Sequence, residues 1–138
     1  ELNLNETPKE AQLQLMADTY ATLFINDEYV DQVYARRSLS LLVDYKRIKF
    51  LDISKFLKKG KNIIKVQVEN FNKNGAAGIN IISKIVLEND TLNILTGKDQ
   101  NWQGKSDNKT WQNVVEKDYR FEVIAPNFAA KRTSWIER

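Results

Sequence analysis

The chain has 138 residues, of which 42% are hydrophobic and 28% are charged, so it can fold around a sizeable core. Its 21 Lys and Arg residues against 18 Asp and Glu residues leave a small positive excess, which does not predict the basic face of a nucleic-acid-binding protein. It contains no cysteine and no histidine, which excludes disulfides and every mechanism in which histidine activates a serine or a cysteine.

No apolar run approaches the roughly 18 residues that a membrane-spanning helix requires, so we expect no membrane span. No signal peptide is recognisable, and residue 1 is Glu rather than Met, which indicates a trimmed, mature or excised chain. Because no repeat, low-complexity segment or linker divides the sequence, we predict a single domain over residues 1–138.

The first third of the chain predicts three strands. Residues 1–10 are polar and form either a tail or a first edge segment. In residues 11–17, apolar and polar positions alternate, which is typical of a half-buried strand. Residues 20–25 are rich in aromatic and β-branched side chains and predict a second strand. A polar turn at residues 26–28, where Asn26 and Asp27 tolerate left-handed backbone angles, would return the chain as a strand over residues 29–33.

The middle of the chain predicts a bulged strand, a turn and a regular strand. Residues 43–53 alternate imperfectly, and residues 52–57 predict one helical turn whose Phe56 and Leu57 enter the core. Residues 58–62 reverse the chain, because Gly60 can adopt a positive φ and Asn62 can hydrogen-bond the local backbone. Residues 64–69 alternate with a strict period of two and predict the clearest strand of the sequence.

The last part predicts short strands between polar segments. Residues 70–78 are rich in Asn and Gly and predict a loop, whereas residues 79–87 and 91–95 predict two strands joined by a turn. Residues 96–117 form a long polar stretch, and residues 120–124 predict a final strand. Many short strands without a long helical period predict an all-β fold, either a sandwich or a barrel.

Two longer motifs resemble one family of β-sandwich domains. Residues 17–30, ADTYATLFINDEYV, resemble a hairpin of the form A-D-D-x-Y-x-[L/V]-[Y/F]-[V/I]-N-G-x-x-V, with Asp27 in place of its glycine. Residues 50–70, FLDISKFLKKGKNIIKVQVEN, resemble Y-D-[V/I]-[T/S]-x-x-L-K-x-G-x-N-x-[I/L]-x-V-x-V-x-N. Residues 78–81 and the D-x-x-W segment at 99–102 follow in the same order. These motifs are similar to those of galactose-binding-like domains attached to glycoside hydrolases.

The resemblance implies an all-β jelly-roll sandwich of the galactose-binding type that has no catalytic activity. It also implies an accessory module of bacterial glycan metabolism that works in an extracellular or periplasmic protein. Some members of the family bind sugars through loops at one end of the sandwich, whereas others only brace a neighbouring domain. We therefore expect the chain to bind carbohydrate through loops at one end of the sandwich, and the alternative partner is a neighbouring protein domain that it braces without binding sugar.

Carbohydrate binding requires an aromatic ring that stacks on the sugar and polar groups that pair with its hydroxyls. Three polar segments supply these groups, and the candidate residues are Trp102, Trp111, Asn72, Asn74, Tyr34 and Arg36. Each has a structural alternative, because tryptophans also fill cores and rims and the other residues suit solvated turns. Trp135, close to the end of the sequence, could either dock a neighbour or cover the sheet.

No Asp or Glu lies in a recognisable catalytic motif, so we expect solvated carboxylates and no catalytic residue. A carboxylate-based hydrolase would require two carboxyl groups facing each other about 5 to 9.5 Å apart. No cofactor is predicted, although loop carboxylates leave a structural calcium ion as a weaker alternative. The lysines between residues 46 and 61 alternate with apolar residues, which is typical of a solvated strand face rather than a nucleic-acid site.

Overall fold

The computed structural model describes residues 1–18, 20–34, 36–38, 43–45, 48–69, 78–96, 101–106 and 109–114, with the backbone alone at residues 18, 36–38 and 43–45. The chain divides into two compact units, Glu1–Thr96 and Gly97–Arg138. The single domain expected from the sequence stays a prediction, because this division does not tell whether the units fold separately. The final strand expected at residues 120–124 and the loop expected at 70–78 lie outside the described residues, except for Gly78.

The described regular structure is β-strand throughout, apart from one 3-10 turn, η1 (Ser54–Phe56), so the all-β prediction is confirmed. Every strand pairing is antiparallel. The second unit contains β12 (Gln103–Gly104) and β13 (Gln112–Asn113). The strands of the first unit are β1 (Leu2–Leu4), β2 (Glu10–Asp18), β3 (Tyr20–Ile25), β4 (Glu28–Tyr34), β5 (Arg36–Ser38), β6 (Val43–Tyr45), β7 (Ile48–Asp52), β8 (Gly60–Asn62), β9 (Ile64–Glu69), β10 (Gly78–Val86) and β11 (Thr91–Leu95).

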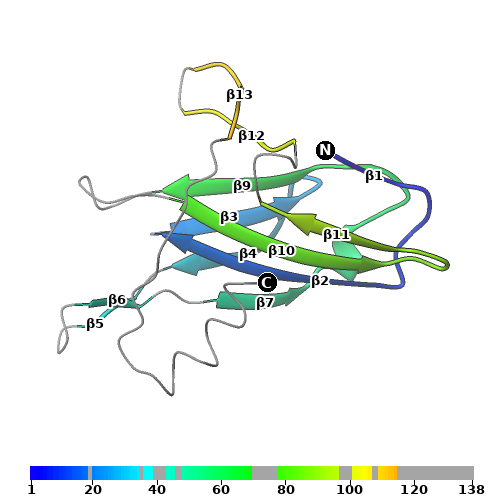
Figure 1. The fold of residues 1–138 in the computed structure, drawn as a ribbon, viewed down its shortest axis with the longest axis horizontal. Coiled ribbons are helices and arrows are strands. Elements are labelled where there is room, and N and C mark those ends of the chain that lie inside the picture. The colour runs from blue at the N-terminus through cyan, green and yellow to red at the C-terminus, as the bar shows by residue number, and fades with distance from the viewer. Residues whose placement is uncertain are drawn as a thin grey trace. The chain divides into compact units, whose positions relative to one another are not determined.

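The two largest sheets of the first unit can be followed in Figure 1, and β1-β8 and β5-β6 form two smaller two-stranded sheets. Of the two largest, one has four strands in the order β11-β10-β2-β7, and the other has three strands in the order β4-β3-β9. The central strands β2 and β3 each bury every second side chain, and these buried side chains meet between the sheets. The result is a sandwich-like arrangement in which each sheet turns one surface inward and one outward.

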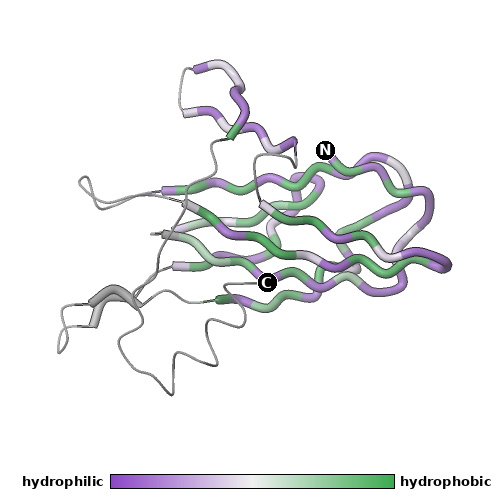
Figure 2. Tube along the Cα trace, viewed as in Figure 1, coloured by the Kyte–Doolittle hydropathy of each residue, from purple (hydrophilic) through white to green (hydrophobic). Residues whose placement is uncertain are grey.

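The core follows directly from period-two patterning, which Figure 2 shows as alternating green and purple along the strands. In β2, Leu13 and Leu15 are no more than 1% exposed, and in β3, Leu23 and Ile25 are fully buried. The remaining buried apolar residues of the described chain are Leu4, Ala11, Ala17, Ala21, Val33, Ile53, Leu57, Ile81, Ile85 and Leu87.

Two local predictions for residues 43–57 require correction. The single bulged strand expected at 43–53 is two strands in different sheets, because β6 pairs with β5 and β7 pairs with β2. Phe56, which we expected in the core, is half-buried under the ammonium group of Lys55, 4.8 Å from the ring centroid. Ile53 occupies the core instead, because its N–H donates to the carbonyl of Ala11 at 2.9 Å and holds the start of η1 against β2.

The two predicted left-handed turns are confirmed. Asn26 and Asp27 have φ angles of 54° and 65° and form a two-residue connection between β3 and β4. Gly60 has a φ of 87° at the start of β8. The edge segment expected within residues 1–10 is β1, which pairs with β8.

Asn62 hydrogen-bonds the local backbone as predicted, and its side chain is fully buried. Its Oδ1 accepts from the Lys58 N–H at 3.0 Å, and its Nδ2 donates to the carbonyls of Lys58 and Gly60 at 2.7 and 3.0 Å. The same Oδ1 accepts from Nδ2 of Asn26 at 2.9 Å. A buried amide with all these partners stabilises the turn that leads into β9.

Candidate functional site

The two predicted tryptophans lie on the hairpin of the second unit but are not brought together. Trp111 is 57% exposed, and the Nζ of Lys105 lies 5.0 Å from its ring centroid. Trp102 is half-buried, and its carbonyl accepts from the Val114 N–H at 3.1 Å. Because Gly104 pairs with Gln112, strand alternation places the two rings on opposite faces of the hairpin. Trp111 therefore has the exposure that a ligand contact needs, and Trp102, the other tryptophan among the described residues, does not lie beside it.

A small hollow of about 210 Å³ lies on this hairpin, and Trp111 is not among its walls. It is below the roughly 300–1,000 Å³ of typical ligand pockets. The residues around it are Gly104, Lys105, Ser106, Lys109, Thr110, Gln112, Asn113 and Val114. The described residues of the hairpin therefore offer one exposed tryptophan ring and a small polar hollow.

The other predicted site residues belong to the first 96 positions. Asn72 and Asn74 lie outside the described residues, and only the backbone of Arg36 is described, within β5. Tyr34, at the end of β4, is 43% exposed. Tyr34 stands directly opposite Tyr20 in the β3–β4 register, on the outer surface of that sheet.

The outer surface of the three-stranded sheet carries rows of aromatic and amide side chains, and we call it the aromatic face. Ala21, Leu23 and Ile25 of β3 are buried, so Tyr20, Thr22 and Phe24 between them point outward. The pairing register sets their neighbours in three rows across β4, β3 and β9: Tyr34–Tyr20–Glu69, Gln32–Thr22–Gln67 and Tyr29–Phe24–Lys65.

Side-chain contacts confirm that these residues share one face. The rings of Phe24 and Tyr29 meet edge to face with their centroids 6.2 Å apart. The Nζ of Lys65 lies 5.0 Å from the centroid of the Phe24 ring. Tyr29 is 52% exposed, so its ring is available on the surface of the sheet.

A β-bulge creates the Tyr29–Phe24 pair. Leu23 pairs with Asp31, but Phe24 pairs with Tyr29, so Val30 is an extra residue in β4. Without this extra residue, Val30 rather than Tyr29 would stand opposite Phe24. This row was not predictable from the sequence, because nothing in the local pattern indicates the bulge. The aromatic residues Tyr20 and Phe24, which alternate with the buried residues of β3, are the one signal of it in the sequence.

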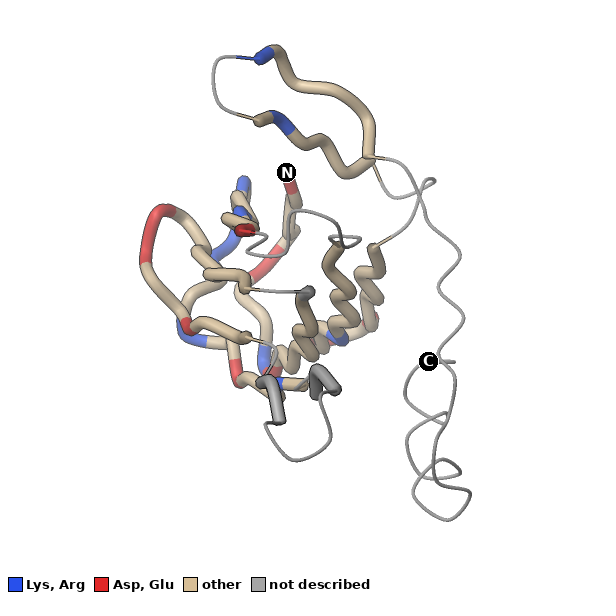
Figure 3. The backbone as a smooth tube through the Cα atoms, turned by 90° about the vertical axis from the view of Figure 1, so that its left-hand side faces the viewer, with Lys and Arg blue, Asp and Glu red and all other residues tan. Residues whose placement is uncertain are grey.

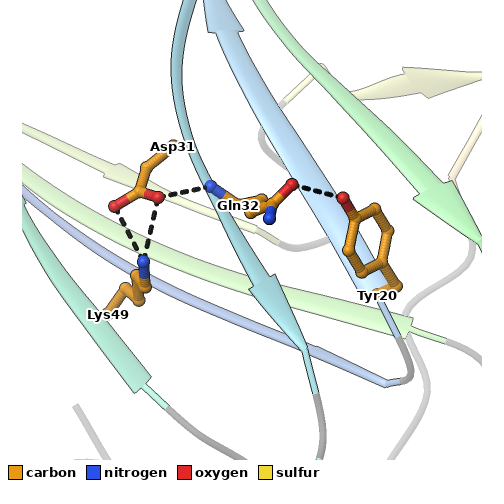
Figure 4. A network of polar contacts seen from close by, with 4 residues as sticks. All are labelled: Tyr20, Asp31, Gln32 and Lys49. Atoms are coloured by element: carbon orange, nitrogen blue, oxygen red, sulfur yellow. Dashed lines mark hydrogen bonds and ion pairs between the residues drawn. The ribbon is translucent and has the colours of Figure 1, made fainter.

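A chain of polar contacts joins the aromatic face to β7, as Figure 4 shows. The Tyr20 hydroxyl donates to the side-chain oxygen of Gln32, and the Gln32 N–H donates to Oδ1 of Asp31 at 2.7 Å. Both carboxylate oxygens of Asp31 lie 2.9 Å from the Nζ of Lys49 in β7, so this ion pair bridges the two sheets. These contacts hold Gln32 in one orientation between the aromatic rows.

The carboxyl groups of Asp31 and Asp52 have lowered pKa values. Burial acts to raise the pKa of Asp31, but the Lys49 ammonium and the Gln32 N–H together outweigh it and hold the pKa below its usual range. The Ser54 hydroxyl and N–H, which hydrogen-bond Asp52 at 2.6 and 2.9 Å, lower the pKa of that carboxyl. Both groups are thus held ionised by structural partners, which is opposite to the raised pKa of a general acid.

The charges of the first unit are interspersed in sign, as the red and blue segments of Figure 3 show. Within the described residues, no group of three or more Asp and Glu side chains could hold a metal ion. The same residues include no helix with the length and apolar character needed to cross a membrane.

The outer surface of the four-stranded sheet has a different chemistry. Phe50 is 68% exposed and Leu95 is 37% exposed. Ile82 pairs with Leu95 on one side and Gln14 on the other, and Gln14 pairs with Phe50, so these four residues form one row. With Met16 and Ile48 in the adjoining row, we call this surface the apolar outer face.

No protein-family model matches the chain, and no curated protein or solved structure is significantly similar to it. The similarity to galactose-binding-like domains therefore stays a prediction from the two motifs.

Proposed function

We propose that this chain is a non-catalytic accessory module of bacterial glycan metabolism that binds carbohydrate through the aromatic face. In this proposal it works in an extracellular or periplasmic protein and has the jelly-roll topology of galactose-binding-like domains. One observation carries the proposal: two rows of aromatic rings flank a row of amide and hydroxyl groups on one open sheet surface.

This arrangement matches the two chemical sides of a sugar. The C–H groups of a pyranose face pack against an aromatic ring, which offers a flat apolar surface with a negative face. Sugar hydroxyls both donate and accept, as do the amides of Gln32 and Gln67 and the hydroxyl of Thr22. The nine described residues of the three rows include no aliphatic side chain, which distinguishes them from a surface suited to burying protein.

The lowered pKa values of two carboxyl groups, those of Asp31 and Asp52, fit a non-catalytic module. Asp31 and Asp52 carry the lowered pKa values of groups that serve the framework, and each is held by hydrogen bonds to neighbouring residues. A glycosidase instead needs one carboxyl group whose pKa is raised so that it can protonate the leaving group.

A glycan array probed with the full chain tests the proposal, and titration of each hit locates the site. We expect Tyr29→Ala and Tyr34→Ala each to weaken binding by about tenfold or more, because exposed aromatic anchors dominate such contacts. Phe50→Ala is the matched control, since Phe50 is an exposed ring on the opposite sheet. Silence across the array, or equal weakening by Phe50→Ala, would contradict the proposed function.

Trp111→Ala in the same titration tests one of the two tryptophans that the sequence suggests as ligand contacts. Loss of this exposed ring should weaken binding only if the hairpin contacts the same glycan. An unchanged affinity would restrict the site to the aromatic face.

The apolar outer face supports a second candidate function, in which the module braces a neighbouring protein domain. Exposed Leu95 pairs with Ile82, and exposed Phe50 stands in the same row on the other side of Gln14. Such patches mark protein interaction sites. Two results together would favour this function over carbohydrate binding. No glycan on the array would bind, and sedimentation velocity would show self-association that Phe50→Glu abolishes.

A further inference from the structure

We infer that the ligand of the aromatic face is an extended, uncharged oligosaccharide that lies along the strands, rather than a single sugar residue. This inference rests on the proposed function and adds the length, direction and charge of the ligand.

The spacing of the aromatic rows indicates the length of the ligand. Tyr20 and Phe24 stand four positions apart on β3, which corresponds to about 14 Å along an antiparallel strand. Each has an exposed tyrosine opposite it on β4, Tyr34 in one row and Tyr29 in the other. A single sugar ring is too small to contact both rows, so only a chain of several residues can use the whole face.

The middle row supplies polar contacts between the two aromatic rows. The side-chain oxygen of Gln32 accepts from Tyr20, which directs its amide NH2 to serve as a donor. The Nε2 of Gln67 lies 3.4 Å from Oε1 of Glu69, which leaves the side-chain oxygen of Gln67 as an acceptor. The Thr22 hydroxyl lies between them in the register. A donor, an acceptor and a hydroxyl at this position suit the hydroxyl groups of the central sugar residues.

The charges of the face indicate an uncharged ligand. Lys65 lies 3.3 Å from Oδ1 of Asp27 and over the ring of Phe24. Glu69 stands in the opposite row and accepts from Gln67. Lys65 and Glu69 at opposite ends balance each other, and Asp27 beside Lys65 adds a negative charge, so the described residues of the face have no excess positive charge that would complement an acidic glycan.

Isothermal titration of the full chain with cello-, xylo-, manno- and galacto-oligosaccharides of one to six residues tests the inference. We expect affinity to rise by about tenfold or more between the monosaccharide and the longest member of the series that binds, because a second aromatic row is then engaged. Tyr29→Ala and Tyr34→Ala should each remove most of this gain while changing short-chain affinity far less. Tyr29→Phe, which keeps the ring, should preserve the gain, and thermal unfolding should show that all three variants fold.

The outcomes separate the inference from the proposed function. If one of these sugars binds equally well as a monosaccharide and as a hexasaccharide, the extended ligand is excluded while carbohydrate binding stands. If the chain prefers uronic-acid oligosaccharides, with affinity that falls steeply as salt rises, the uncharged ligand is excluded. If no glycan binds but a proline-rich peptide docks on the rings, both the inference and the proposed function fail.

Discussion

The side chains of Asn26 and Asn62 meet in the first unit although 36 positions separate them in the chain, with Nδ2 of Asn26 2.9 Å from Oδ1 of Asn62. Asn26 also donates to the Phe56 carbonyl at 2.9 Å and accepts from the Ile63 N–H at 3.0 Å. One amide pair thereby joins the β3–β4 turn, the end of η1 and the start of β9. Such networks contribute most when every buried group is satisfied.

We expect Asn62→Ala to lower the free energy of unfolding by about 3 kcal/mol or more, because it leaves several buried backbone and amide groups without partners. Urea unfolding followed by circular dichroism measures the change. Asn93→Ala, at an exposed position of β11, is the matched control and should change stability by less than about 0.5 kcal/mol. A loss at Asn62 as small as that of the control would show that the network contributes little.

Gly60→Ala should destabilise the chain by about 1–2 kcal/mol, since an L-residue is strained at a φ of 87°. Nothing lies within 4 Å of the Cβ that the substitution adds, so the cost is purely conformational. Gly104→Ala is the control, because its Cβ would meet Cγ1 of Val114 at an ordinary 3.7 Å. Equal unfolding midpoints for Gly60→Ala and the parent chain would contradict this assignment.

Asp27→Gly should stabilise the chain by about 0.5–1 kcal/mol, because a two-residue hairpin turn with φ > 0 at both positions favours Asn-Gly. The substitution loses the Lys65–Asp27 contact, but at side-chain exposures of 51% and 86% that pair contributes almost nothing. Thermal unfolding measures the gain, and Asp27→Ala, which cannot use the left-handed region so easily, should lower the midpoint instead. A lower midpoint for Asp27→Gly would mean that the carboxylate has a role beyond the turn.

The Asp31–Lys49 pair should make stability depend on acid pH. Because its pKa is lower in the folded chain than in the unfolded chain, Asp31 contributes stability above the unfolded value of about 3.9. This contribution is lost as the pH falls through the folded pKa. Asp31→Asn should therefore cost about 1 kcal/mol at pH 7 and progressively less below about pH 4.

Urea unfolding of the parent chain and Asp31→Asn across this pH range measures the difference. Glu88→Gln is the control, because its ion pair with Lys9 is more than half exposed at both side chains. A difference between parent and Asp31→Asn that stays constant down to pH 2 would contradict the role of the charge.

Strands with a clean local pattern were predictable. In β2 and β9, apolar and polar residues alternate regularly, so that an extended chain has one apolar side and one polar side. The turn at Asn26 and Asp27 was predictable for a related reason, since these residue types tolerate the left-handed backbone that a tight connection needs. Each of these features depends on residues adjacent in the chain.

Features that depend on pairing partners were not predictable. The residues 43–53 look like one strand, and only their partners β5 and β2 separate them into two. The bulge at Val30 leaves no mark in the alternation of residues 29–33, yet it decides that Tyr29 stands beside Phe24. The candidate site residues selected from the sequence therefore included Tyr34, but neither Tyr20 opposite it nor Phe24 and Tyr29 in the other aromatic row.

By itself, the sequence determined that this protein is built from short strands, that alternate positions of β2 are buried, and where Gly60 reverses the chain. Those properties follow from side-chain periodicity and local backbone preference, which act within a few residues. Only the tertiary structure decided which strands are neighbours, and hence that three aromatic and amide rows line one open sheet surface. The physical reason is that strand register is set by hydrogen bonds and core packing between segments distant in sequence, such as β3 and β9.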